Sequence, residues 1–184
     1  MKIGLWITGL VTLLLGGFLL WSLGLPTEWE AQGTRHLDAD EPDVRALVSD
    51  PAAWSRWTDW PEGGESFSGP ESGSGAIREW NDTYYGEGSF TISESREGYV
   101  AYAVVVEGGS MTIEGQITLT REDDGTSIQW TEVGHFSRNP MLLFAGRRIA
   151  EQQSSLLDES LEKLSGILSG SAAGATRPAA SPSR

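Results

Sequence analysis

The chain has 184 residues, no cysteine, and a formal net charge of −13 from 13 basic and 26 acidic side chains. Without cysteine it has no disulfide, no thiolate nucleophile and no cysteine-based zinc site. Because faces that bind nucleic acid or anionic lipid need clustered Lys and Arg, this charge excludes both as partners. The acidity itself favours solubility.

An uncharged apolar run opens the chain. Residues 3–25 contain no Asp, Glu, Lys or Arg, and a helix of that length would be about 34 Å long, against a bilayer core of roughly 30 Å. The run is longer than the apolar region of a signal peptide and ends without a small-residue cleavage site. We therefore expect residues 1–26 to form an uncleaved transmembrane anchor, in preference to a cleaved signal peptide or a buried helix.

The charges that flank this run predict its orientation. Lys2 and the amino terminus precede it, whereas Glu28 and Glu30 follow it. Basic groups are retained on the cytoplasmic side of a membrane. The sequence therefore predicts a single-pass membrane protein with a cytoplasmic N-terminus and a periplasmic or otherwise extracytoplasmic domain.

Residues 27–168 are close to the commonest size of a single domain. A first strand is expected over residues 29–37, and Asp40 can then cap a short helix that runs to Ser49. A second helical turn and a loop rich in Gly, Ser and Pro follow. These two segments are expected at residues 51–57 and 62–75.

Beyond this loop the hydrophobic period changes to two, which predicts strands. Turn-forming pairs such as Glu97-Gly98 and Asp124-Gly125 separate them, so we expect an antiparallel meander. Between Met111 and Thr120 apolar and polar residues alternate strictly, which indicates that one face of the sheet is covered. The strands are expected at residues 76–80, 88–93, 99–106, 111–120 and 126–133.

The last predicted element is a long amphipathic helix. Asn139 can cap it and Pro140 can begin it, and Leu and Ile then recur at helical spacing as far as Leu168. We expect this apolar face to cover the sheet. Residues 169–184 are Ser, Ala, Gly, Thr, Pro and Arg only, a composition typical of a disordered tail.

The order of these elements is that of the helix-grip fold, an α+β fold. Three segments resemble the START-like polyketide cyclase/dehydrase and lipid-transport superfamily (SRPBCC), some members of which carry a leading membrane anchor. As a departure, Asp40 and Glu41 stand where members often have two prolines. The resembling segments are Leu37-Asp38-Ala39 with Val44 to Trp57, Gly69-Pro70 through Gly75 with Glu79-Trp80, and Gly125-Thr126-Ser127-Ile128-Gln129-Trp130.

The resemblance implies an apolar cavity between a curved sheet and the long helix, used in many relatives to hold lipids, sterols, polyketides or other hydrophobic small molecules. It implies no reaction, since the superfamily has no universal catalytic motif. Six of the eight tryptophans lie outside the apolar run, and large aromatic side chains line ligand cavities, although they also fill ordinary cores. The residues expected to bound the cavity are Trp57, Trp60, Trp80, Phe90, Tyr102, Met111, Ile113, Trp130, Phe144 and Ile149.

Two polar residues near the end of the last strand are weak catalytic candidates. Alternation places Glu132 on the same face as Trp130, toward the covered side of the sheet. A buried carboxylate is costly without a partner and often functional, and His135 could be that partner. The alternative is that Glu132 lies in water at the strand end and His135 in a loop.

We therefore expect a membrane-tethered, non-enzymatic module that binds a hydrophobic small molecule or lipid and needs no cofactor or metal. Two alternatives stay open. One is a cyclase/dehydrase-type enzyme in which Glu132 or His135 transfers a proton. The other is a structural or interaction domain whose cavity is filled by side chains, which would leave no void larger than a few waters.

Overall fold

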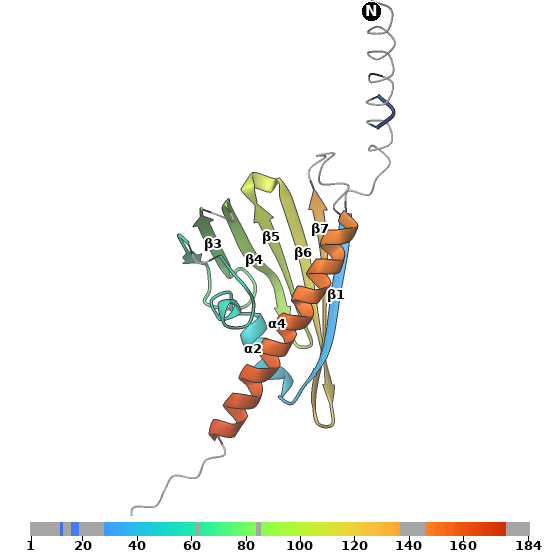
Figure 1. Cartoon of the computed structure of the whole chain (residues 1–184). Coiled ribbons are helices and arrows are strands. Elements are labelled where there is room, and N and C mark those ends of the chain that lie inside the picture. Colours follow the sequence, from blue (N-terminus) through green and yellow to red (C-terminus); the bar gives the residue numbers. More distant parts are fainter. Residues whose placement is uncertain are drawn as a thin grey trace, which may run out of the picture.

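A seven-stranded antiparallel sheet curves around one long helix, as Figure 1 shows. The computed structural model describes Thr12 and residues 16–18, 28–61, 63–83, 86–136 and 146–175. Its helices are α2 (Glu41–Val48) and α4 (Gly146–Ala175), with 3-10 turns at Ala53–Arg56 and Glu107–Gly109. The strands are β1 (Glu28–Leu37), β2 (Ser66–Ser68), β3 (Ile77–Asp82), β4 (Gly86–Arg96), β5 (Tyr99–Val106), β6 (Met111–Glu122) and β7 (Gly125–Phe136).

The strand order confirms the predicted meander. It runs β1-β7-β6-β5-β4-β3-β2, and each neighbouring pair is antiparallel. From β2 to β7 the strands that follow one another in the chain are neighbours in the sheet, whereas β1 joins the far edge beside β7. With α4 laid across one face (Figure 1), this is the α+β helix-grip arrangement expected from the sequence.

The core lies between this face of the sheet and α4. In β7, alternate residues Thr126, Ile128 and Trp130 are buried, as the period of two requires. On α4, Leu157, Leu161, Leu164 and Leu168 are buried at helical spacing. The predicted apolar faces of sheet and helix therefore meet as expected.

Cross-strand pairs of an aromatic residue and a glycine shape the inner face of the sheet. Tyr102 on β5 lies opposite Gly115 on β6, and Trp80 on β3 lies opposite Gly88 on β4. A Cβ atom added at either glycine would overlap the opposing ring. The absence of a side chain lets each ring lie across the neighbouring strand, which holds Tyr102 and Trp80 close to the sheet.

Several boundaries differ from the prediction. The loop expected at residues 62–75 contains the short strand β2, which pairs with β3. Asp40 occupies the N-cap position of α2, but its side chain makes no capping hydrogen bond. The predicted start of the last helix, at Asn139 and Pro140, lies outside the described residues.

The C-terminal helix is longer than expected. It continues to Ala175, so the boundary between domain and tail predicted at residue 169 falls inside α4. Small residues such as Ala propagate a helix readily once a long segment has nucleated it. The rest of the predicted tail, residues 176–184, lies outside the described residues.

The predicted membrane topology is wrong. Across the residues that the structure describes, none of the helices combines the length and the apolar character needed to cross a bilayer. This finding overturns the expected localisation, with its cytoplasmic N-terminus and extracytoplasmic domain. Lack of charge is not enough for a span, which also requires a continuous apolar helix of about 20 residues. Of the expected anchor, only Thr12 and residues 16–18 are described.

Candidate functional site

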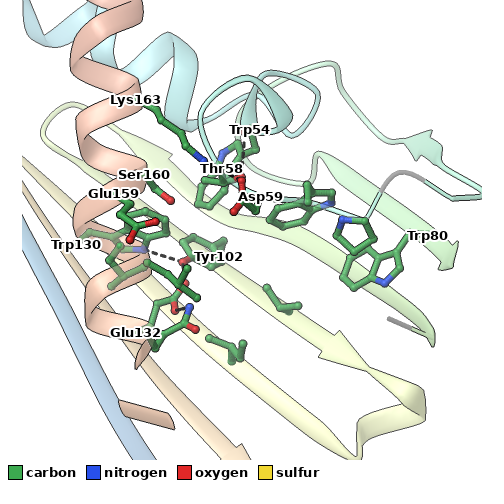
Figure 2. Close-up of a pocket in the computed structure, with 17 residues that line it drawn as sticks. Trp54, Thr58, Asp59, Trp80, Tyr102, Trp130, Glu132, Glu159, Ser160 and Lys163 are labelled. Atoms are coloured by element: carbon green, nitrogen blue, oxygen red, sulfur yellow. Dashed lines mark hydrogen bonds and ion pairs between the residues drawn. The ribbon is translucent and has the colours of Figure 1, made fainter. Parts of the chain in front are cut away.

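A cavity of about 290 Å³ lies between the sheet and α4, and Figure 2 shows its lining. At about 30 Å³ per water in the liquid, this equals roughly ten water volumes. Its walls are the inner faces of four strands, the segment after the 3-10 turn, and one face of α4. The lining residues are Trp54, Thr58, Asp59, Trp60, Pro61, Trp80, Tyr102, Val104, Ile113, Trp130, Glu132, Gln153, Leu156, Leu157, Glu159, Ser160 and Lys163.

Edge-to-face aromatic contacts build one side of this cavity. The ring of Trp54 lies 5.5 Å from that of Trp130 and 4.9 Å from that of Tyr102, both nearly perpendicular. Trp60 and Trp80 form a similar pair at 5.7 Å. The indole N–H of Trp54 donates to the backbone oxygen of Val48 at 2.9 Å, which fixes the ring. Such packing is the favoured geometry of aromatic pairs and makes a rigid apolar wall.

Glu132 supplies a buried carboxylate to the same cavity, with 5% of its surface exposed. Trp130 donates its indole N–H to the Tyr102 hydroxyl at 2.7 Å, and this hydroxyl donates to Oε1 of Glu132. The second carboxylate oxygen accepts from Nε2 of Gln153 on α4 at 2.8 Å. In Figure 2 a dashed line marks the hydrogen bond from Trp130 to Tyr102, with Glu132 below it. It ties the sheet to the helix through one acidic group.

Burial shifts the pKa values of both acids in this chain. Desolvation raises the pKa of Glu132, although the hydrogen bonds from Tyr102 and Gln153 partly offset it. Desolvation, with the nearby charge of Glu132, raises the pKa of Tyr102 well above its ordinary value. Tyr102 therefore stays a neutral donor, and Glu132 can exchange a proton nearer to neutral pH than an exposed carboxylate can.

The mouth of the cavity carries charged side chains. Lys163 on α4 donates to the carboxylate of Asp59 at 2.8 Å, and the side chains are 48% and 75% exposed. Glu159 is exposed beside them, and Leu156 keeps 38% of its surface exposed. The cavity thus has an apolar interior, one buried acid and a polar rim.

The structure divides the predicted lining residues into three groups. Trp60, Trp80, Tyr102, Ile113 and Trp130 line the cavity; their role in binding stays a prediction. Four others are not among the lining residues: Trp57 and Phe90 are fully buried in the core, and Met111 and Ile149 pack against it. Aromatic and aliphatic residues suit a core and a cavity equally, which is why composition did not separate them. Phe144 lies outside the described residues.

His135 is not the partner of Glu132. It lies 3.5 Å from Glu28, with its side chain 39% exposed. An odd separation of three residues along a strand places two side chains on opposite faces of the sheet. The partners are Tyr102 and Gln153, which the sequence analysis did not connect to Glu132.

Apart from Val104 on β5, the lining residues that were not predicted from the sequence come from two segments. Trp54, Thr58, Asp59 and Pro61 belong to the turn beside the mouth, while Gln153 and Ser160 belong to α4. On the helix a signal was available. Gln153 and Ser160 interrupt the apolar stripe at helical spacing, and polar residues on a face that covers a sheet mark a place where packing is incomplete.

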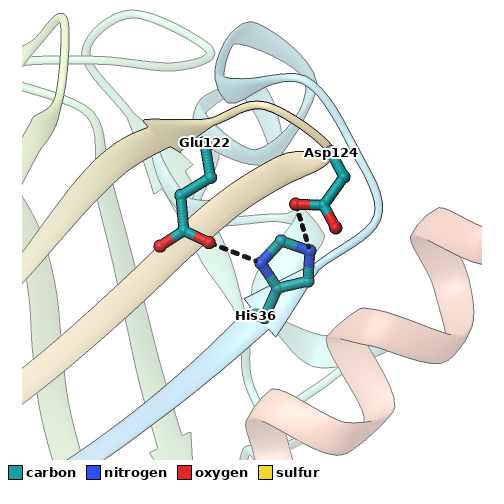
Figure 3. Close-up of side chains that lie close together, drawn as sticks. All are labelled: His36, Glu122 and Asp124. Atoms are coloured by element: carbon teal, nitrogen blue, oxygen red, sulfur yellow. Dashed lines mark hydrogen bonds and ion pairs between the residues drawn. The ribbon is translucent and has the colours of Figure 1, made fainter.

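A second cluster of titratable side chains lies at the C-terminal end of β1, beside the β6–β7 hairpin (Figure 3). Nδ1 of His36 lies 2.9 Å from Oε2 of Glu122, and its Nε2 lies 3.6 Å from Asp124 and 3.5 Å from Asp38. Ligand atoms of His36, Glu122 and Asp124 fall within 4.8 Å of one another, and these residues are exposed. Residues so far apart in sequence gave no sign of this grouping.

The electrostatics of this second cluster are those of an ion-pair network. Desolvation lowers the pKa of His36, but the hydrogen bond with Glu122 and the charges of Asp124 and Asp38 outweigh it and raise the pKa. A protonated imidazole supplies the positive charge that the surrounding carboxylates favour. The contacts of His36 with these carboxylates therefore form an ion-pair network.

Comparison with known proteins agrees with this fold. A family model described as "Polyketide cyclase / dehydrase and lipid transport" matches residues 28–166. No match is found among curated proteins.

Three similar solved structures illustrate the breadth of the fold. An uncharacterised protein from Rhizobium leguminosarum has a TM-score of 0.56 at 18% identity, covering 78% of this chain and 95% of that one. Norcoclaurine synthase of Thalictrum has a TM-score of 0.58 at 11% identity, covering 79% and 96%.

The third is the di-domain ARO/CYC StfQ from the steffimycin biosynthetic pathway, with a TM-score of 0.63 at 9% identity. The alignment covers 80% of this chain and 52% of StfQ, so the chain spans about half of that protein. Identities this low show a shared fold and no more. The family match, in contrast, extends over the whole sheet and over α4 as far as residue 166, and the chain therefore belongs to the polyketide cyclase/dehydrase and lipid-transport family.

Proposed function

We propose that this domain binds a hydrophobic small molecule or lipid in the cavity between the sheet and α4. The observation that supports the proposal is the cavity itself, whose volume of about 290 Å³ is bounded mainly by tryptophan, tyrosine and aliphatic side chains. Concave, mostly apolar pockets with a few polar groups are the usual form of small-molecule sites. A domain whose cavity is filled by side chains would leave a void of only a few waters, so this alternative loses support.

Filling the cavity tests the proposal. We expect Ile113→Trp to abolish binding, because the larger side chain would occupy the space, whereas Thr112→Trp on the outer face of the same strand should bind as the wild type does. The measurement is quenching of intrinsic tryptophan fluorescence by a panel of apolar compounds, combined with native mass spectrometry of the purified protein. The proposal would be contradicted if the wild type carried no co-purified compound and bound none of the compounds in the panel.

A second candidate is an enzyme of the cyclase/dehydrase type, and the position of Glu132 favours it. This carboxylate lines the cavity with a raised pKa, as a group that moves a proton near neutral pH requires. With His135 on the opposite face, the candidate depends on Glu132 alone.

Hydrogen exchange tests this second candidate. For a cavity-bound ketone such as 4-phenylbutan-2-one in D₂O, an active Glu132 would remove a proton beside the carbonyl and deuterium would replace it. We would then expect NMR to show exchange at those carbons with the wild type and only the background rate with Glu132→Gln. Equal exchange rates with the two proteins would contradict the enzyme candidate and leave ligand binding as the proposed function.

A further inference from the structure

The charged side chains of this cavity indicate the chemical class of its ligand. This inference rests on the proposed function. Glu132 is 5% exposed, and among the described residues no Lys, Arg or His forms an ion pair with it. A buried carboxylate is costly unless a cation compensates it, since hydrogen bonds neutralise only part of its charge. Within the described part of the chain, this negative charge is thus buried without a positive partner.

The hydrogen bonds around Glu132 leave it able to accept more donors. An indole N–H can only donate, so Trp130 makes the Tyr102 oxygen an acceptor and directs the Tyr102 proton at Glu132. Gln153 donates to the other carboxylate oxygen. An ionised carboxylate has about four lone-pair positions, and these two donors fill only half of them. The remaining positions suit the N–H groups of an ammonium.

The other charges of the lining have the same sign. Among the residues that the structure describes, four charged side chains line the cavity, and three of them are acidic: Asp59, Glu132 and Glu159. The one basic side chain, Lys163, is bound to Asp59 at 2.8 Å. A low-dielectric cavity with this excess of negative charge favours the entry of cations and disfavours anions.

The aromatic wall also suits a cation. Trp54, Trp60, Trp80 and Trp130 line the cavity together with Tyr102. The faces of such rings attract ammonium groups, tryptophan most strongly. The same faces pack against an apolar or aromatic body, so both parts of one ligand find a matching surface.

We propose that the ligand of this cavity is an organic amine, whose ammonium group is held by Glu132 and whose apolar body packs against the tryptophans. By the same argument fatty acids and other anions are excluded, because they would bring a like charge to a buried carboxylate. The volume, roughly ten waters, restricts the body to a small one.

The test compares three probes of one shape and different charge: 4-phenylbutylamine, 4-phenylbutan-1-ol and 4-phenylbutanoate. Calorimetric titration at pH 8, where an alkylamine is still protonated, gives each affinity for the wild type, Glu132→Gln and Glu159→Gln. Both variants remove one negative charge from the lining, but only Glu132 is buried. Thermal melting of both variants checks that each is folded.

We expect the wild type to bind the amine about tenfold or more tightly than the alcohol, and the carboxylate weakest. This preference should disappear in Glu132→Gln and persist within about threefold in Glu159→Gln, since an exposed rim charge contributes little to affinity. Equal affinities of amine and alcohol in the wild type, or a preference that survives in Glu132→Gln, would overturn the proposal while leaving apolar binding intact. If the wild type binds none of the three probes, both this proposal and the proposed function are contradicted.

Discussion

At the scale of single residues, the position of Tyr102 depends on the glycine that lies opposite it in the sheet. Tyr102 delivers its proton to Glu132 only because its ring lies across Gly115, the residue opposite it on β6. An alanine at that position would put a Cβ where the ring now is. Gly115 is therefore a positioning residue for the buried acid, although it does not line the cavity.

We expect Gly115→Ala to lower the free energy of unfolding by about 1–3 kcal/mol, since an overpacked core must shift a ring or a strand. It should also weaken binding in the cavity, because Tyr102 would leave Glu132. Urea unfolding and the fluorescence titration measure the two effects.

Gly166→Ala is the matched control for this change. An added Cβ at Gly166, on the exposed side of α4, meets nothing within 4 Å, so this variant should be stabilised by about 0.5–1 kcal/mol through helix propensity, with binding unchanged. A Gly115→Ala protein as stable as the wild type, with normal binding, would contradict the positioning role.

At the scale of elements, α4 has two tasks along one face. Leu161 and Leu164 are buried in the core and do not line the cavity. At neighbouring positions of the same helix, Gln153, Leu156 and Ser160 border the cavity. The helix thus closes the core at its middle and leaves space where polar and small residues replace large apolar ones.

This division predicts different results for two leucines on the same helix. Leu161→Ala removes a fully buried side chain and should cost about 2–5 kcal/mol of unfolding free energy. Leu156 is 38% exposed, so Leu156→Ala should cost less than about 1 kcal/mol and act mainly on ligand affinity. Chemical denaturation with parallel binding measurements separates the two, and equal destabilisation would refute the assignment of tasks.

At the scale of the whole molecule, two buried carboxylates respond to pH in opposite ways. Glu41, 2% exposed, accepts from the backbone N–H of Gly98 and from Arg45 and Arg121. Although desolvation raises the pKa of Glu41, the hydrogen bonds from Gly98, Arg121 and Arg45 outweigh it and lower the pKa. No cation among the described residues pairs with Glu132, and burial raises its pKa. The difference between the two acids is the pair of arginines that contacts Glu41.

The sign of each contribution follows from these directions. The pKa of folded Glu41 lies below its ordinary 4.5, so its stabilisation is present above that pH and is lost as pH falls through the lowered value. The pKa of folded Glu132 lies above 4.5, so stability falls as pH rises from 4.5 through the raised value.

We therefore expect Glu41→Gln to lose about 1–2 kcal/mol at pH 7, a modest value because Arg45 and Arg121 are partly exposed. Glu132→Gln should melt above the wild type at pH 8 and lose the difference below pH 4.5. Calorimetric melting between pH 3 and 8 gives both curves, with Glu114→Gln on the outer face of β6 as the control. Parallel curves of melting temperature against pH for all four proteins would refute the opposite pH responses of Glu41 and Glu132.

The sequence by itself determined the order of the elements and which face of each one is buried. The period of two placed Glu132 with Trp130 on the covered face, and the helical spacing of leucines identified the face of α4. These features were readable because side-chain direction in strands and helices is a local property. The same parity would also have placed His135 on the opposite face.

Only the tertiary structure decided what these residues meet. Tyr102 and Gln153 reach Glu132 from 30 and 21 positions away, and Trp57 and Phe90 pack in the core while Trp54 and Trp60 line the cavity. It also overturned the membrane span that the apolar run suggested. The cavity arises where the curved sheet and α4 fail to close on each other, and this mismatch depends on contacts between distant segments that no local pattern encodes.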